Sequence, residues 1–133
     1  MIAIGLPTQT HAVGAAPDLV RPLLRLEGLA MFIAGLIAYD RLGGDWLWLV
    51  PALLVPDLSA IGYLAGPVVG SVVYDLVHNW ALGLAVLGLG LWVGVPLVTL
   101  AGVILIAHVG MDRVAGYGLK HPSGFKDTHL QRA

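Results

Sequence analysis

The chain has 133 residues, of which 58% are hydrophobic and 11% are charged, and its formal net charge is −1. So few charges cannot supply the polar shell of a soluble helical protein, and the charge balance argues against a nucleic-acid partner. The absence of cysteine excludes disulfides, thiolate nucleophiles and cysteine-based zinc sites.

Four apolar stretches follow one another along the chain, at residues 23–40, 46–64, 68–91 and 96–113. Each is close to the roughly 20 residues that a helix needs to cross a bilayer. Short connections rich in glycine and proline separate them, and short connections make neighbouring helices antiparallel. The sequence therefore predicts an all-α membrane protein, a bundle of four transmembrane helices in up-down order.

Six of the seven Lys and Arg residues flank one side of this bundle, and only Arg41 lies on the other. The six are Arg21, Arg25, Arg113, Lys120, Lys126 and Arg132. The positive-inside rule then places both termini in the cytoplasm, with the chain a multi-pass protein of the inner (cytoplasmic) membrane. We divide it into a cytoplasmic lead-in at 1–22, the transmembrane domain at 23–113 and a cytoplasmic tail at 114–133.

Apart from Arg25, Asp40 and Arg113 near their ends, the apolar stretches contain six ionisable side chains, all of them carboxylates or imidazoles. They are Glu27, Asp57, Asp75, His78, His108 and Asp112. Counting along each helix from the cytoplasmic boundary places all six in the cytoplasmic half of the bundle. Ionisable groups inside membrane spans are costly, and by default they mark a functional site.

The spacing of these residues predicts a metal site. His108 and Asp112 are four residues apart and Asp75 and His78 are three apart, so each pair should share one helix face. Carboxylate and imidazole ligands suit zinc, which we favour, while iron and manganese stay open. We expect the ligands to be Asp57, His78, His108 and Asp112.

Two further carboxylates are assigned to catalysis. Glu27 is expected to be the general base or a further ligand, and Asp75 to orient His78 through its other ring nitrogen. Ordinary roles stay open as well, because Asp112 could pair with Arg113 and Glu27 could reach the membrane surface. An unmetallated hydrogen-bond network is the alternative for the whole set.

The tail mixes turn-forming residues with cations beside the proposed site. Arg113, Lys120 and Lys126 are candidates to bind the phosphate or carboxylate of a substrate, with the tail as a lid. A solvated tail attracted to anionic lipid headgroups is the alternative.

Several motifs resemble a known family of bacterial membrane proteins, the domain of unknown function 4260. They include the run from His108-Val-Gly-Met-Asp112 to Lys120, together with Leu26-Glu27-Gly28, Pro56-Asp57-Leu-Ser59 and Tyr74-Asp75-Leu-Val-His78. The resemblance covers about residues 23–130 and implies a four-helix architecture but no activity. The family often carries Asn at the position of Asp75, which argues against an obligatory ligand there.

Pro56-Asp57, His78 and His108-Val-Gly-Met-Asp112 are also similar, in the same order, to elements of integral membrane metal-dependent hydrolases. Those enzymes carry a second Asp where this chain has Ser59. The similarity implies hydrolysis by a divalent metal, and we expect a membrane lipid or another lipid-like amphiphile as the substrate.

A non-enzymatic role is the alternative function. The same carboxylates and imidazoles could serve a proton-coupled carrier. An accessory subunit could instead pack through Gly66-x-x-x-Gly70 and through Gly83, Gly88 and Gly90, and a homo-oligomer stays open.

Overall fold

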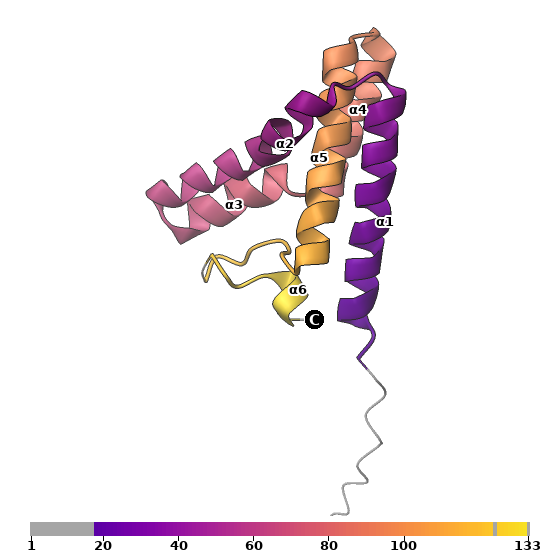
Figure 1. Ribbon diagram of the computed structural model, residues 1–133. Helices are drawn as coiled ribbons and strands as arrows, with labels where there is room; N and C mark the ends of the chain where they lie inside the picture. The colour runs from indigo at the N-terminus through magenta and orange to yellow at the C-terminus, as the bar shows by residue number, and fades with distance from the viewer. Residues whose placement is uncertain (1–17, 124, 133) are drawn as a thin grey trace, which may run out of the picture.

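The computed structural model describes residues 18–123 and 125–132, and within them the chain is helical apart from its connections (Figure 1). Residues 1–17 of the expected lead-in lie outside this part of the chain. The elements are α1 (Val20–Arg41), α2 (Trp46–Leu54), the 3-10 helix η1 (Val55–Ala65), α3 (Pro67–Val77), α4 (Trp80–Val93), α5 (Pro96–Ala115) and α6 (His129–Arg132).

Three helical stretches are long and apolar enough to cross a membrane: Val20–Arg41, Trp46–Ala65 and Pro96–Ala115. The pair α3 and α4 passes the same test as one span, but it bends by 44° at the break between the two helices. The all-helical class and the membrane character expected from the sequence are thus confirmed. Within the described residues there are three candidate spans by length and composition, or four if the bent pair crosses as one.

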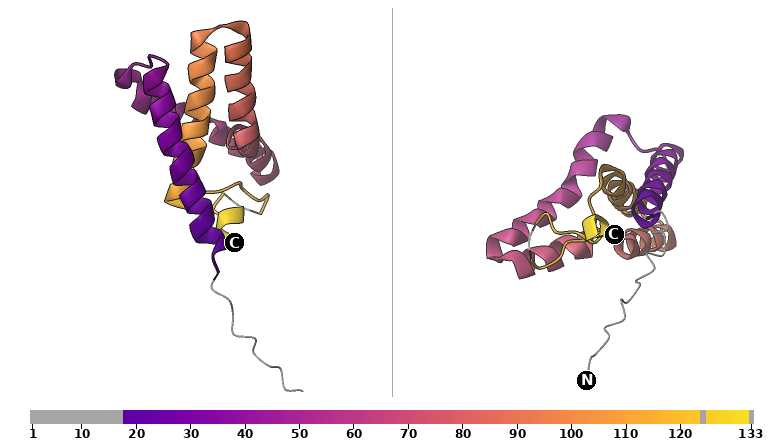
Figure 2. Two further views of the ribbon diagram at one scale, coloured as in Figure 1. Left: turned by 90° about the vertical axis from the view of Figure 1, so that its right-hand side faces the viewer. Right: turned by 90° about the horizontal axis from the view of Figure 1, so that it is seen from below.

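A tight bundle of α1, α4 and α5 forms one part of the molecule. Both α1 and α4 run alongside α5 (Figure 2), and small residues allow the close approach. A Cβ atom added to Gly28 would lie 2.3 Å from the Cβ of Arg113, and one added to Gly90 would lie 2.3 Å from the amide nitrogen of Thr99. Glycine is therefore required at these contacts, since no larger residue fits between the helices.

The segments α2, η1 and α3 form an arm that is inclined away from this bundle (Figure 1). Within the arm, η1 packs against α3, whereas α2 crosses α5. This arrangement differs from the regular up-down bundle that we expected. The reason lies at the ends of the arm's helices, because Gly66 turns the chain with a φ of 109° and α3 ends at Val77, with His78 and Asn79 outside helical structure.

The C-terminal segment, residues 116–132, folds back against both parts. Its only β pairing in the described part of the chain is the bridge between Lys120 and Thr128, and Leu130 is buried. From the bundle, Arg21 donates to the carbonyls of Leu130 and Gln131. From the arm, Asp75 accepts a hydrogen bond from the Lys120 amide. The segment is thus a docked structure that ties bundle and arm together.

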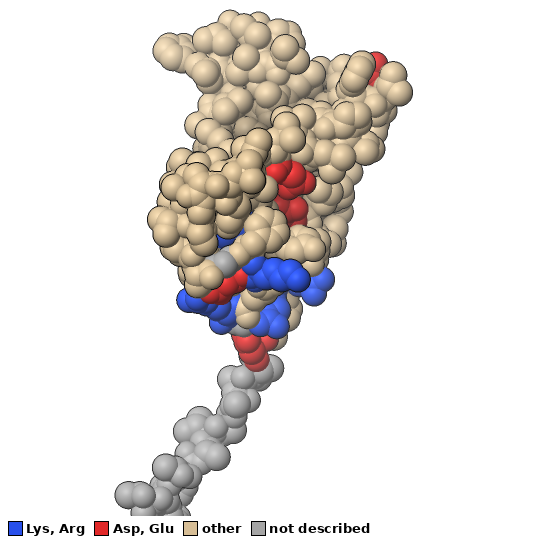
Figure 3. All heavy atoms as spheres, turned by 90° about the vertical axis from the view of Figure 1, so that its left-hand side faces the viewer, with Lys and Arg blue, Asp and Glu red and all other residues tan. Residues whose placement is uncertain are grey.

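The basic side chains gather at the end of the molecule where the C-terminal segment lies (Figure 3). Carboxylate atoms are exposed just above them on the same face.

Candidate metal centre

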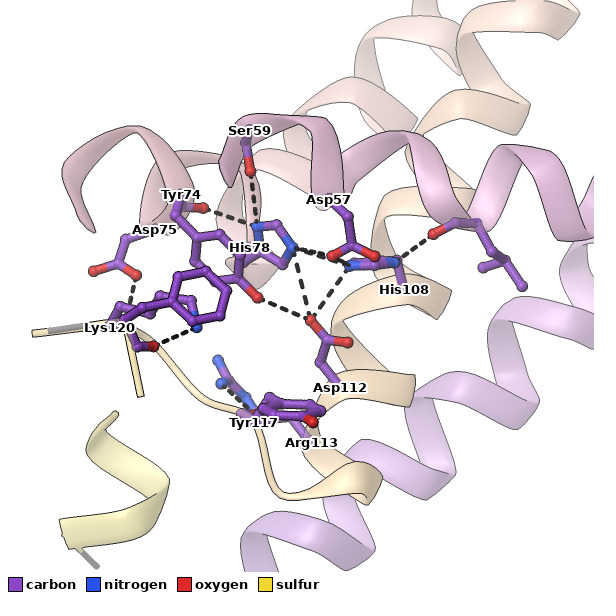
Figure 4. Close-up of polar contacts among 12 residues, drawn as sticks. Asp57, Ser59, Tyr74, Asp75, His78, His108, Asp112, Arg113, Tyr117 and Lys120 are labelled. Atoms are coloured by element: carbon purple, nitrogen blue, oxygen red, sulfur yellow. Dashed lines mark hydrogen bonds and ion pairs between the residues drawn. The ribbon is translucent and has the colours of Figure 1, made fainter. Parts of the chain in front are cut away.

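Four side chains from three elements converge where the arm meets α5. Asp57 comes from η1, His78 follows α3, and His108 and Asp112 lie one turn apart on α5 (Figure 4). One ligand atom from each residue lies within 4.8 Å of all the others. The sequence named these four residues as one cluster, and the structure brings them together.

The distances within this cluster are short. The two Nε2 atoms of His78 and His108 lie 3.0 Å apart. The Oδ1 atom of Asp57 is 3.4 Å from Nε2 of His78 and 3.3 Å from Nε2 of His108. The Oδ2 atom of Asp112 is 3.7 Å and 3.3 Å from the same two nitrogens.

A backbone carbonyl fixes the ring of His108. Its Nδ1 donates to the carbonyl oxygen of Leu53, at the end of α2. At this point the backbone amide of Val55 donates to the carbonyl of Ala52, three residues earlier, as in a 3-10 helix. In the same pattern the carbonyl of Leu53 would accept from the backbone amide of residue 56. Residue 56 is a proline and has no N–H, so the Leu53 carbonyl is free to accept from the imidazole.

Tyr74 fixes the ring of His78 in two ways. The Nδ1 atom of His78 lies 2.9 Å from the carbonyl oxygen of Tyr74, and the two rings stack with centroids 3.6 Å apart and planes 7° from parallel. The phenol of Tyr74 also donates to Oδ2 of Asp112, at 3.3 Å. The Ser59 hydroxyl, 3.4 Å from Nδ1, completes the surroundings of the ring.

These contacts determine which ring nitrogens carry hydrogen. A carbonyl oxygen can only accept, so each neutral imidazole must hold its proton on Nδ1, where it faces Tyr74 or Leu53. Both Nε2 atoms then present lone pairs to each other and to two carboxylate oxygens. Four acceptors that face one another repel, and the arrangement is stabilised only when a cation lies among them.

The cluster opens on the carboxylate side. The imidazole side chains are only 3% and 0% exposed, whereas the Asp57 side chain is 49% exposed and that of Asp112 is 15% exposed. A pocket of about 280 Å³ lies on this side, lined by Asp57, Ala60, Tyr74, Asp112, Tyr117, Lys120 and Phe125. A small ligand can therefore reach the carboxylate edge of the cluster.

Lys120 forms one wall of this pocket although it is almost fully buried, at 5% exposure. Its Nζ donates to the carbonyl of Phe125 at 2.7 Å and lies over the rings of Phe125 and Tyr74. Burial lowers the pKa of this ammonium group from its ordinary value, and the carboxylates of Asp112, Asp75 and Asp57 oppose that shift.

The sequence model of a domain of unknown function, DUF4260, matches residues 21–133. The chain belongs to this family. No curated protein and no solved structure matches it significantly. The expected family is thus confirmed, while the similarity to membrane metal-dependent hydrolases stays a prediction.

The two carboxylates assigned to catalysis lie elsewhere in this DUF4260 chain. Glu27 is exposed on α1, next to Gly28, which faces α5. Asp75 is directed away from His78 and accepts from the Lys120 amide at 2.7 Å (Figure 4). The carbonyl of Tyr74 holds Nδ1 of His78 in the place where we expected Asp75.

The three cations expected to bind the substrate differ in where they lie relative to the pocket. Only Lys120 lines the pocket. Arg113 is buried and donates to the carbonyl of Tyr117, and Lys126 is exposed and outside the pocket lining.

Sequence reasoning missed the aromatic side chains of the pocket, Tyr74, Tyr117 and Phe125. Tyr74 could have been proposed from the sequence, because it lies four residues before His78 and the continuous helix expected over 68–91 would place both on one face. The free carbonyl of Leu53 could also have been predicted, because Pro56, three residues later, has no N–H to donate to it. The other two aromatics lie on a segment whose path no local pattern predicts.

Proposed function

We propose that this DUF4260 protein binds a divalent metal ion, zinc in the first instance, through Asp57, His78, His108 and Asp112. The observation that carries the proposal is the convergence of four hydrogen-bond acceptors with both Nδ1 protons directed outward, to Tyr74 and Leu53. A cation among them would turn mutual repulsion into coordination.

The size of the cluster supports this proposal. Ligand atoms about 2.0–2.1 Å from a tetrahedral zinc ion lie about 3.3 Å from each other. Five of the six distances between ligand atoms range from 3.0 to 3.7 Å, and the sixth, between the two carboxylate oxygens, is at most 4.8 Å. Oxygen and imidazole ligands also suit iron or manganese, so the metal found in the protein decides its identity.

The activity we propose is metal-dependent hydrolysis of a lipid or related amphiphile. A divalent metal acidifies coordinated water and so supplies hydroxide near neutral pH. Water adds to the carbonyl carbon or phosphorus of an ester, the bond to the alcohol oxygen breaks, and the alcohol leaves with the proton from water. The half-exposed Asp57 would give the substrate access to the metal held by the four side chains.

We further propose that the basic end of the molecule faces the cytoplasm in the bacterial inner membrane, with both termini on that side. The asymmetry of Lys and Arg supports this orientation, since Arg41 alone lies at the opposite end of its helix. Reporter fusions at each terminus test it, and a periplasmic signal from either one would overturn it.

Elemental analysis of the purified full-length protein tests the metal site. It should be prepared without chelator, and any metal-affinity tag should be removed. We expect about one equivalent of metal in the wild type. His78→Asn and His108→Asn should lose it, because Asn keeps a polar group but removes the imidazole ligand. His129→Asn, in the C-terminal segment, is the matched control and should keep its metal.

A wild type without metal, even after incubation with zinc, iron or manganese, would overturn the proposal. The cation among the four acceptors would then be a proton on one imidazole. That result would favour the proton-coupled carrier, because a proton-bound cluster lacks the hydroxide source that hydrolysis needs.

A further inference from the structure

We infer that the pocket beside the cluster binds an anion of the phosphate class, held between the metal ion and the ammonium of Lys120. The inference rests on the proposed metal site and names the kind of group that the site accepts. It also assigns this role to Lys120 rather than to Lys126 or Arg113.

Lys120 is built into the pocket wall. Buried lysines are rare, and this one is held at both ends. Its backbone pairs with Thr128 and donates to Asp75, while its Nζ lies 3.6 Å from the ring centroid of Phe125 and 4.4 Å from that of Tyr74. A side chain this restrained loses little further conformational freedom on binding a ligand.

The ammonium group keeps donors for a ligand. It carries three N–H donors, and the Phe125 carbonyl is its one hydrogen-bond acceptor among residues 18–123 and 125–132. The two aromatic rings attract its charge but accept no conventional hydrogen bond. Because Lys120 lines the same pocket as Asp57 and Asp112, an anion in the pocket can meet both the ammonium and the metal.

The charges make such binding depend on the metal. Without a metal, the pocket presents two carboxylates and one ammonium group, which together repel an anion. A divalent ion neutralises the two carboxylates of the pocket, so Asp75, outside the pocket lining, is the one carboxylate of the three near Lys120 that still opposes its charge. Anion binding should therefore require both the metal ion and Lys120.

The size and lining of the pocket favour a headgroup over a whole lipid. Its volume of about 280 Å³ lies just below the usual range for small-molecule pockets, about 300–1,000 Å³. The rings of Tyr74, Tyr117 and Phe125 provide apolar surface beside the ammonium of Lys120 and the proposed metal ion. A phosphate with a short alkyl substituent fits this combination.

The test measures binding of inorganic phosphate and of hexyl phosphate by calorimetry. It uses the full-length protein in detergent, once loaded with stoichiometric zinc and freed of excess zinc, and once stripped of metal. We expect phosphate to bind only the zinc-loaded form. Lys120→Met should weaken binding at least about 10-fold, the loss of one charge-assisted hydrogen bond. Lys126→Met is the matched control and should bind as the wild type does.

Two readouts guard against misfolding of the Lys120→Met variant. Lys120→Arg keeps the cation and should retain binding, and the wild type can be followed directly by NMR of labelled lysine ammonium groups. In that spectrum the Lys120 signal should shift when phosphate is added, and the Lys126 signal should not.

Tighter binding of hexyl phosphate than of inorganic phosphate would identify a lipid headgroup as the ligand, and equal binding would identify the free anion. Equal phosphate binding with and without zinc, or an unshifted Lys120 signal, would overturn the inference. Zinc-loaded protein that binds no phosphate would overturn it too, while leaving the metal site intact. Protein that binds none of zinc, iron and manganese contradicts the proposed function itself.

Discussion

The bundle and the arm of this molecule are built on opposite principles. In the bundle, α1 and α4 approach α5 so closely that glycines such as Gly28 and Gly90 have no room for a Cβ atom. In the arm, the helices are interrupted, first by the 3-10 segment η1 and then by the break at His78 and Asn79. The candidate metal centre lies where the arm crosses the bundle, at both interruptions.

The difference shows how an apolar chain can hold polar chemistry. Within a continuous helix each carbonyl already accepts a backbone amide. Pro56 frees the carbonyl of Leu53 for the ring of His108, whereas the carbonyl of Tyr74, at the end of α3, accepts both the backbone amide of His78 and its ring Nδ1. Interrupted helices serve membrane transporters similarly, where freed backbone groups line a binding site. The bundle supplies His108 and Asp112 from a continuous helix, and the arm supplies Asp57 and His78 from its interrupted segments.

The largest expected effect separates two carboxylates of the arm. Asp57→Asn should weaken zinc binding at least about 100-fold, more than the roughly 10- to 100-fold typical of changes around the ligands. Asp75→Asn should leave zinc affinity unchanged, because Asp75 contacts the Lys120 amide and Asn keeps an oxygen that can accept from it. Competition with a chelator of known affinity measures both variants.

Equal loss of zinc affinity in the two variants would break this distinction. It would mean that the C-terminal segment, held by Asp75, contributes to the metal centre as much as a direct ligand does.

The second effect concerns the bundle. A Cβ atom in Gly28→Ala would lie 2.3 Å from the Cβ of Arg113, so α1 must move away from α5. Overpacking of this kind costs about 1–3 kcal/mol of stability and should lower the melting temperature in detergent. The metal content of the folded protein should stay at its wild-type level, since the contact lies outside the cluster.

Gly88→Ala is the control for that substitution. Nothing lies within 4 Å of a Cβ atom at position 88, so the melting temperature should stay the same or rise slightly. A variant at Gly28 that melts like the wild type would show that the close packing of α1 on α5 contributes little.

The helices and the four cluster residues could be predicted from the sequence because both follow from spacing. Apolar stretches of the right length gave the helical segments, and His108 and Asp112 share a face of a continuous helix. Their expected place in the cytoplasmic half of the bundle linked them to Asp57 and His78. These rules use distance along a helix, which the sequence defines directly.

The remaining assignments needed the direction of a side chain or the end of a helix. Asp75 and His78 would share a face if α3 continued, but His78 lies outside the helix with φ −98° and ψ 37°. Glu27 has a suitable depth, but its neighbour Gly28 is the residue that faces α5. Gly70 and Gly83 pack inside the chain, on Tyr63 and Ile106, so neither is free for the partner contacts that we considered.

A smaller effect tests how the arm supports the centre. Tyr74→Phe removes the hydroxyl that donates to Asp112 but keeps a ring stacked on His78 and under Lys120. We expect about a 10-fold loss of zinc affinity, at the low end for groups that orient a ligand. Tyr74→Leu, which removes the ring as well, should lose more. Identical affinities in the two variants would assign the whole effect of Tyr74 to its hydroxyl.

The smallest expected effect concerns the C-terminal segment that joins the two regions. The Nδ1 atom of His129 accepts a hydrogen bond from the Leu119 amide at 2.7 Å, which requires a neutral ring. Burial lowers the pKa of His129 below its ordinary value of 6.5. The charge of Arg113 and that of His121 act in the same direction, while the carboxylate of Asp75 opposes them.

The unfolded segment therefore binds a proton more readily than the docked one, and docking weakens as the pH falls. The contribution of His129 is fully present above about pH 6.5 and is lost as the pH falls from there toward the lowered pKa. Hydrogen exchange at the Leu119 amide should accelerate over that interval, after correction for the intrinsic pH dependence of exchange. His129→Gln offers an oxygen that does not titrate, so its corrected rate should stay constant, and a wild-type rate that is equally constant would show that His129 does not control docking.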